Sequence, residues 1–158
     1  MRTALVLLCL LVTSSPVLAQ FWTPYQSDRL GYAIDIPPGY EPQGEIDDGE
    51  GTVFVDTATT QVLTVRGGPT SHGFEAEVRS ALVREQSDAW NITAETITPQ
   101  WARFTAIKGM RVLYVHMITG CDGAAYAGFR LDYLVTDRAA IDDIIEGLVP
   151  TLQPPSRC

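Results

Sequence analysis

Hydrophobic and polar residues alternate along most of this chain, and a period of two predicts β-strands. Residues 30–36 place Tyr32, Ile34 and Ile36 on one face and more polar residues on the other, which is typical of a half-buried strand. A Pro-Pro-Gly turn at 37–39 ends it. The chain before it, residues 20–29, mixes aromatic and polar residues and is interpreted as an irregular lead-in.

Two further strands are expected after a polar loop at residues 41–51. The β-rich runs 52–56 and 61–66 are separated by four residues rich in Ala and Thr, so they predict a hairpin. Gly67-Gly68-Pro69 is expected to stop the second strand.

Two segments have the helical period of 3.6 instead. The first begins at Phe74, and its apolar positions are Phe74, Val78, Ala81, Leu82 and Ala89. The second covers 139–148 and carries Ile141, Ile144, Ile145 and Leu148 as a narrow apolar stripe. Asp137 is the expected N-cap of this second helix, and Pro150 is expected to end it.

Between the helices lie four β-rich runs, at 92–98, 101–107, 110–119 and 124–135. The breaks between them are too short for a parallel crossover, so neighbouring strands must be antiparallel. Both alternating sets of 110–119 are largely apolar, which indicates a central strand covered on both faces. The pattern predicts an α+β domain: a mainly antiparallel sheet of about six or seven strands flanked by two helices, in the order βββαββββα.

The first 19 residues have the pattern of a cleavable signal peptide. Arg2 precedes an apolar run at 4–12, residues 13–16 interrupt that run, and Val17-Leu18-Ala19 offers a cleavage site. A retained anchor would need roughly 17 or more apolar residues. We expect export to the periplasm or the extracellular space, no membrane insertion after cleavage, and a single globular domain at 20–158.

Charge narrows the possible partners. The chain carries a formal charge of -8, and loss of a leader with one base and no acid makes it -9. Nucleic acids and anionic membranes are bound through clustered Lys and Arg, whereas Lys108 is the only lysine of the predicted mature chain and its arginines are scattered. The composition therefore argues against nucleic-acid binding.

Cleavage would remove Cys9 and leave Cys121 and Cys158. An even pair in an oxidising compartment is read as a disulfide. A bridge closing a loop of roughly 37 residues contributes about 4 kcal/mol by the chain-entropy estimate. Free thiols or pairing between molecules are the alternatives. Two cysteines do not make a structural zinc site, which takes four Cys or His ligands.

The opening strand with its turn, residues 32–40 (Tyr-Ala-Ile-Asp-Ile-Pro-Pro-Gly-Tyr), and the order of elements resemble one known superfamily. It is the α/β/α sandwich that includes the photosystem II extrinsic protein PsbP and a nuclear import factor that binds the Ran GTPase. Within it, the chain looks most similar to small periplasmic proteins of bacteria. The resemblance implies the fold and a mostly non-catalytic binding or accessory role, and it assigns no functional residues.

Ser71 and His72 place a nucleophile beside a base at a strand-to-helix turn. A nucleophile elbow needs glycine two residues before and two residues after the serine; Gly73 satisfies one side, and Pro69 fails the other. A polar loop that leads into the helix is the simpler interpretation. His116 has apolar neighbours on its strand and is read as a core or partner-bonded histidine.

The acidic loop 45–51 and four aromatic residues are the remaining candidates. The loop offers oxygen ligands for calcium, but its spacing departs from the EF-hand, and a solvated turn is the favoured interpretation. The aromatic residues could line a ligand groove or close the edges of a core; they are Trp22, Tyr25, Trp90 and Trp101.

No acid, base and nucleophile converge in the sequence. The expectation is therefore an exported, non-catalytic binding or accessory protein without a cofactor, whose partner is another envelope protein or a small ligand. The alternative is an envelope hydrolase whose site is assembled from distant residues, with Ser71, His72 and His116 as candidates.

The leader and the disulfide are tested by one measurement. The intact mass of the protein recovered from the exported fraction should correspond to a chain that starts at Gln20. It should rise by two hydrogen atoms after reduction, because the Cys121–Cys158 bond takes up one hydrogen at each sulfur. An unchanged mass after reduction would refute the bridge.

Overall fold

The computed structural model describes residues 21–46 and 49–158; the predicted signal peptide at 1–19 lies outside the described residues. Two short 3₁₀ turns, η2 (Cys121–Gly123) and η3 (Val135–Asp137), flank the ninth strand. The strands and α-helices are β1 (Thr23–Gln26), β2 (Ala33–Ile36), β3 (Tyr40–Ile46), β4 (Gly51–Asp56), β5 (Val62–Pro69), α1 (Phe74–Ser87), β6 (Asn91–Ile97), β7 (Trp101–Lys108), β8 (Arg111–Gly120), β9 (Ala125–Leu134) and α2 (Arg138–Thr151).

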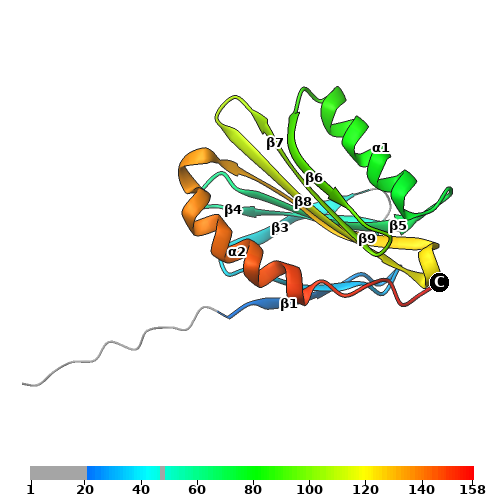
Figure 1. Ribbon diagram of the computed structural model, residues 1–158. Helices are drawn as coiled ribbons and strands as arrows, with labels where there is room; N and C mark the ends of the chain where they lie inside the picture. The colour runs from blue at the N-terminus through cyan, green and yellow to red at the C-terminus, as the bar shows by residue number, and fades with distance from the viewer. Residues whose placement is uncertain (1–20, 47–48) are drawn as a thin grey trace, which may run out of the picture.

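Seven strands form one antiparallel sheet in the order β3-β4-β5-β9-β8-β7-β6, and β1 and β2 form a separate two-stranded sheet. The α+β class, the β4–β5 hairpin and the β6–β9 meander are confirmed. Helix α1 lies over one face of the sheet, near β6 and β7, whereas α2 and the β1–β2 hairpin lie on the opposite face (Figure 1).

Two of the strands occupy segments that the sequence pattern assigned to a lead-in and a loop. Strand β1 lies within 20–29, and β3 occupies most of the supposed loop 41–51. Both are largely exposed and therefore lack the apolar alternation that marks a half-buried strand. Strand β3 lies at one edge of the sheet, and its pairing with β4 shifts register between Pro42 and Gly44. A proline and a register shift are both common in edge strands.

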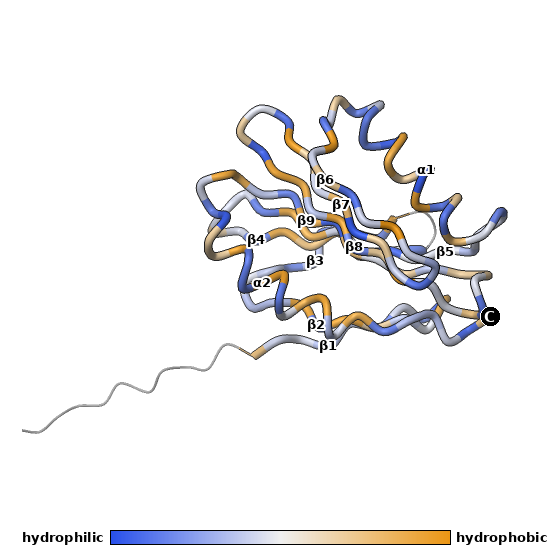
Figure 2. The backbone as a smooth tube through the Cα atoms, in the orientation of Figure 1, coloured by the Kyte–Doolittle hydropathy of each residue, from blue (hydrophilic) through white to orange (hydrophobic). Residues whose placement is uncertain are grey.

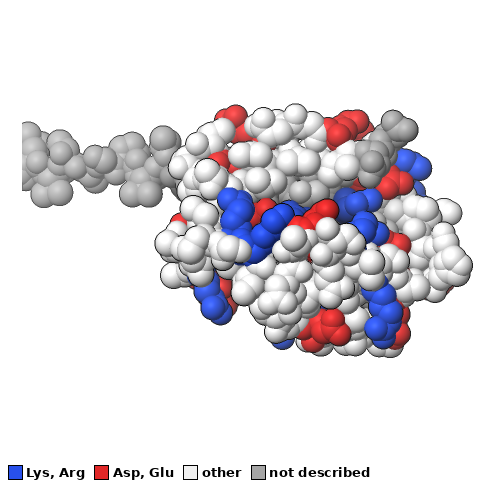
Figure 3. Space-filling model, turned by 90° about the horizontal axis from the view of Figure 1, so that it is seen from above, with Lys and Arg blue, Asp and Glu red and all other residues white. Residues whose placement is uncertain are grey.

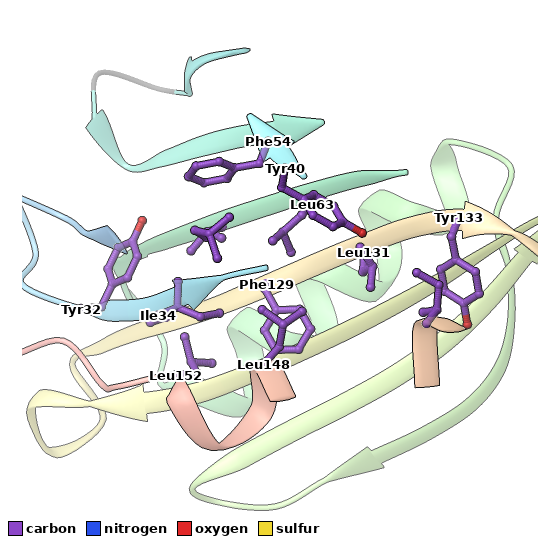
Figure 4. Close-up of a cluster of buried hydrophobic side chains, with 14 residues drawn as sticks. Tyr32, Ile34, Tyr40, Phe54, Leu63, Phe129, Leu131, Tyr133, Leu148 and Leu152 are labelled. Carbon is purple, nitrogen blue, oxygen red and sulfur yellow. The ribbon is translucent and has the colours of Figure 1, made fainter. Parts of the chain in front are cut away.

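The sheet buries two separate clusters, one on each face. In the α2 cluster, Ile141 and Leu148 pack against Leu63, Phe129 and Leu131 of the sheet, and Figure 4 shows side chains from the hairpin, the sheet and α2 pointing into a common space. In Figure 2 hydrophobic and hydrophilic residues alternate along the strands. The α1 cluster contains Phe74, Val78, Ala81, Leu82, Trp90, Ala102, Phe104, Ala106, Leu113, Val115, Met117 and Tyr126.

The ends of the helices differ from expectation in three places. Asp137 is the N-cap residue of α2, as expected, but its side chain makes no capping bond, and one of its carboxylate oxygens accepts a hydrogen bond from Gln61 (3.4 Å). Pro150 lies in the last turn of α2, which continues to Thr151. A proline there has no N–H for the Glu146 carbonyl, so this turn is weakened without being ended. Ala89 lies beyond α1 with a positive φ of 64° and is not part of its apolar face.

The C-terminal tail is fixed to the start of β2. The structure places the Cys121 and Cys158 sulfur atoms in a bond, with Cα atoms 5.7 Å apart, a separation usual for disulfides. Upstream of Cys158, the Gln153 N–H donates to the Ala33 carbonyl (2.8 Å), and the Ser156 N–H donates to Leu30 (3.2 Å). The tail thus joins the β8–β9 turn to the β1–β2 hairpin.

No helix in the part of the chain that the structure describes is long and apolar enough to cross a membrane.

Tyr32 anchors the hairpin to the sheet through a glycine. Its side chain is 0% exposed, and its hydroxyl donates to the Glu50 carbonyl (3.0 Å). A Cβ on Gly67 would lie 2.7 Å from a Tyr32 ring carbon and 2.7 Å from the Tyr126 carbonyl oxygen. The Gly67-Gly68 pair therefore does not stop β5, as the sequence suggested; it lets the strand continue to Pro69 under the Tyr32 ring.

Gly67→Ala should lower the free energy of unfolding by about 2 kcal/mol or more, because the new methyl group meets a fixed ring and a ladder carbonyl. Gly44→Ala is the matched control, since a Cβ there meets nothing within 4 Å, and its effect should stay within about 0.5 kcal/mol. Denaturant unfolding of both variants measures the difference. Equal stabilities would show that the hairpin adjusts freely.

Candidate functional site

An open groove lies between α2 and the half of the sheet that α2 leaves uncovered. We call it the α2 groove; its volume is about 770 Å³. Alternate residues of β7 and β8 form its floor, because Trp101 pairs with Ile118 and Arg103 pairs with His116, which places these side chains on one face. The lining residues are Trp101, Arg103, Tyr114, His116, Ile118, Ile145, Glu146, Val149 and Pro150.

Aromatic rings run across the floor of the groove. The His116 ring stacks on Trp101, with centroids 6.1 Å apart, and lies 5.9 Å from Phe129 on its other side. Phe129 is also stacked at 5.9 Å on Tyr114. The Arg103 guanidinium lies 6.0 Å from the Trp101 ring centre, within cation–π range. The floor is therefore a rigid aromatic surface with one cationic group above it.

His116 is held in its neutral form. It is 7% exposed, and its Nδ1 atom is buried without a hydrogen-bond partner among the described residues. Burial, with a smaller contribution from the Arg103 charge, lowers the pKa of His116 to about 4. A catalytic histidine base is normally oriented by a third group on its other nitrogen, and no described residue bonds Nδ1 here. His116 therefore serves as an uncharged stacking residue.

The two walls carry opposite charges. Arg103 projects from β7 and Glu146 from α2, and both are exposed. Between them the groove is aliphatic, with Ile118, Ile145 and Val149. Burial raises the pKa of Tyr114, partly offset by the Arg103 charge, so its phenol stays neutral. The groove offers an apolar surface flanked by one cation and one anion.

The candidate nucleophile and bases do not meet. Ser71 and His72 are exposed in the loop between β5 and α1, whereas His116 lines the α2 groove. Of the aromatic candidates, Trp101 lies in the groove, while Trp22 packs on α2 at Gly147 and Trp90 lies below Arg130 and Lys108.

The acidic loop is partly occupied by ion pairs. Asp47 and Asp48 lie outside the described residues, and the Glu50 carboxylate lies 3.6 Å from Arg66 and 3.8 Å from Arg29. Within 21–46 and 49–158, no three His, Cys, Asp or Glu side chains are placed to hold a metal ion. Whether the complete loop binds calcium stays a prediction.

The sequence pattern singled out His116 and Trp101 but missed three other groove residues: Arg103, Tyr114 and Glu146. The sequence did contain a signal for Arg103 and Tyr114. Trp101 and Arg103 share one alternating set in their strand, and Tyr114 and His116 share one in the next. Nothing local could indicate Glu146, because α2 reaches the groove only through tertiary packing.

No protein-family model matches the chain, and no curated protein matches it. Solved structures do share its fold. Cyanobacterial PsbP (CyanoP) from Synechocystis sp. PCC 6803 matches with a TM-score of 0.63 and 13% identity, over 91% of this chain and 98% of that chain. The Saccharomyces cerevisiae Ran-binding protein Mog1p matches with a TM-score of 0.61 and 10% identity, over 85% of this chain and 96% of that chain.

These similarities confirm the expected fold. At 13% and 10% identity they carry no residue roles to this chain. The similarity to small bacterial periplasmic proteins stays a prediction.

Acid should destabilise the protein through His116. Its pKa is about 4 when folded and about 6.5 when unfolded, so between these values the unfolded chain binds a proton that the folded protein does not. Stability should fall as the pH decreases from about 6.5 to 4, by on the order of 3 kcal/mol.

Denaturant unfolding at several pH values should give a flatter profile for His116→Phe than for the wild type across this range. The exposed His72→Phe is the matched control and should keep the wild-type slope. Identical slopes in all three proteins would contradict the role given to His116.

Proposed function

We propose that the protein is an exported, non-catalytic binding protein that holds an apolar segment of another envelope protein in the α2 groove. One observation carries the proposal: a groove of about 770 Å³ brings Trp101, Arg103 and Tyr114 together on an uncovered part of the sheet. Contiguous exposed apolar surfaces of this kind mark interaction sites.

The residue types favour a protein partner. Trp, Tyr and Arg are the residues most enriched among those that dominate binding energy at protein interfaces. The Trp101 ring stacks on His116, which in turn lies against Phe129, so little side-chain freedom would be lost on binding. The groove is open along its length, whereas small-molecule sites enclose most of the ligand.

The opposite charges of the two groove walls restrict which partner sequences can bind. A partner segment with an apolar residue over Ile118 and Val149 would place an acidic side chain near Arg103 and a basic one near Glu146. Charges at the rim of an interface act mainly on orientation and association rate, whereas the apolar centre supplies affinity.

A non-catalytic role is supported by the state of the groove's titratable groups. Tyr114 and His116 are both neutral near pH 7 by the direction of their pKa shifts. The candidate nucleophile Ser71 lies in another loop. The solved structures with this fold include a protein whose name describes it as Ran-binding, which is compatible with a binding role.

Trp101→Ala and Arg103→Glu should each weaken partner binding, with about 30-fold loss of affinity for Trp101→Ala if it acts as an interface anchor. The measurement starts from a photo-crosslinking residue at position 146 in the groove wall, which identifies the partner in the native envelope. Affinity of the purified pair is then determined for each variant.

Matched controls come from the exposed side of α1, outside the groove. Val83→Ala shortens an apolar side chain as Trp101→Ala does, and Arg79→Glu reverses the charge of an exposed arginine as Arg103→Glu does. They should bind as the wild type does. Unchanged affinity of the groove variants would refute the proposed site. Loss of a measured hydrolase activity in His72→Ala or His116→Ala would instead favour the hydrolase alternative.

A further inference from the structure

A second hollow lies on the opposite face of the sheet, between α1 and strands β5, β8 and β9. We call it the α1 cavity; its volume is about 100 Å³. It is more enclosed than the α2 groove and has room for several waters or one small organic molecule. Its lining residues are Thr64, Arg66, Ala81, Arg84, Glu85, Phe104, Val115, Met117, Tyr126, Gly128, Phe129 and Arg130.

The register of the sheet explains the shape of the cavity. Arg66 pairs with Gly128 across β5 and β9, and Met117 pairs with Gly128 on the other side. A Cβ at Gly128 would lie 2.7 Å from the His116 carbonyl oxygen and 3.0 Å from Met117 Cγ, so only a glycine fits between the arginine and the methionine. Ala81 and Phe104 continue the apolar side, so one part of the cavity is hydrophobic and the other is cationic.

The lining carries an excess of positive charge. Three arginines, Arg66, Arg84 and Arg130, line the cavity, and Glu85 is the one acid among its described lining residues. Glu85 is bound to Arg130 at 2.9 and 3.2 Å. Each arginine also has a carboxylate beside it that does not line the cavity: Glu77 lies 3.3 Å from Arg84, Glu50 lies 3.6 Å from Arg66, and Asp132 lies 3.6 Å from Arg130.

This excess stands out because the chain as a whole carries a charge of -8. Figure 3 shows Lys and Arg side chains in a band across the middle of the molecule seen from above, with Asp and Glu side chains between them.

Tyr126 adds a neutral donor inside. The residue is 4% exposed and lines the cavity. Its phenol can donate one hydrogen bond to a ligand oxygen or a water. Burial is the main cause that raises the pKa of Tyr126, so the phenol keeps its proton to donate.

We propose that the α1 cavity binds a small organic carboxylate whose apolar body lies against Ala81, Phe104 and Met117 and whose carboxylate faces the arginines. The carboxylate would accept charge-assisted hydrogen bonds from the guanidinium groups and one from the Tyr126 hydroxyl. This site is independent of the α2 groove, because it lies on the other face of the sheet and the two sets of lining residues have no member in common.

Benzoate is the probe, titrated into the disulfide-bonded protein and followed by amide chemical shifts. Saturable shifts should appear at the residues that line the cavity. Arg66→Gln and Arg84→Gln should each weaken binding about tenfold, and Tyr126→Phe by a smaller factor, because each removes a hydrogen-bond donor to the carboxylate. Arg84 is half exposed, so its replacement tests the site even if Arg66→Gln does not fold.

Arg79→Gln is the matched control on the same helix, since Arg79 is exposed and does not line the cavity; its affinity should equal that of the wild type. Equal affinity for benzamide would refute the role of the carboxylate, and equal affinity for inorganic phosphate would refute the role of the apolar body. Shifts confined to other parts of the chain, or unchanged binding in the lining variants, would overturn the proposal.

Discussion

The two faces of the central sheet must both be covered, and neither helix is long enough to cover one alone. Strand β8 therefore has side chains packed on both faces of the sheet. Leu113, Val115 and Met117 are buried under α1, whereas Tyr114 and His116 face the side of α2. Because α1 packs on the β6–β8 half of one face and α2 on the β4–β9 half of the other, each face keeps an uncovered half. The α2 groove and the α1 cavity both lie at the borders of that coverage.

The sequence was sufficient to predict this arrangement wherever burial imposed a pattern. The apolar character of both alternating sets in 110–119 indicated a central strand, and β8 is one. The pattern failed at β1 and β3, which are exposed and therefore under little pressure to alternate. It also failed at Gly67, where the glycines signal close contact with Tyr32 and not the end of a strand.

The site could be predicted only in part, for a related reason. Trp101 and His116 are conspicuous as residue types, but their role depends on the β7–β8 register, which pairs Arg103 with His116. The far wall, with Glu146, depends on how α2 docks. The three arginines of the α1 cavity looked scattered in the sequence, since they come from β5, α1 and β9, yet the fold gathers them. Long-range contacts of this kind leave no local pattern.

The C-terminal tail connects the disulfide to the groove. The wall residues Val149 and Pro150 lie in the last turn of α2, where proline removes one helical hydrogen bond. That turn is held from outside: the Thr151 hydroxyl accepts from the Asp35 N–H (3.2 Å), and the Gln153 N–H donates to Ala33 (2.8 Å).

The Gln153 contact belongs to a tail that the Cys121–Cys158 bond ties to the β8–β9 turn. The loop-closure contribution of about 4 kcal/mol expected for a loop of roughly this length is comparable to several hydrogen bonds. The bridge therefore stabilises the wall of the α2 groove as well as the chain end.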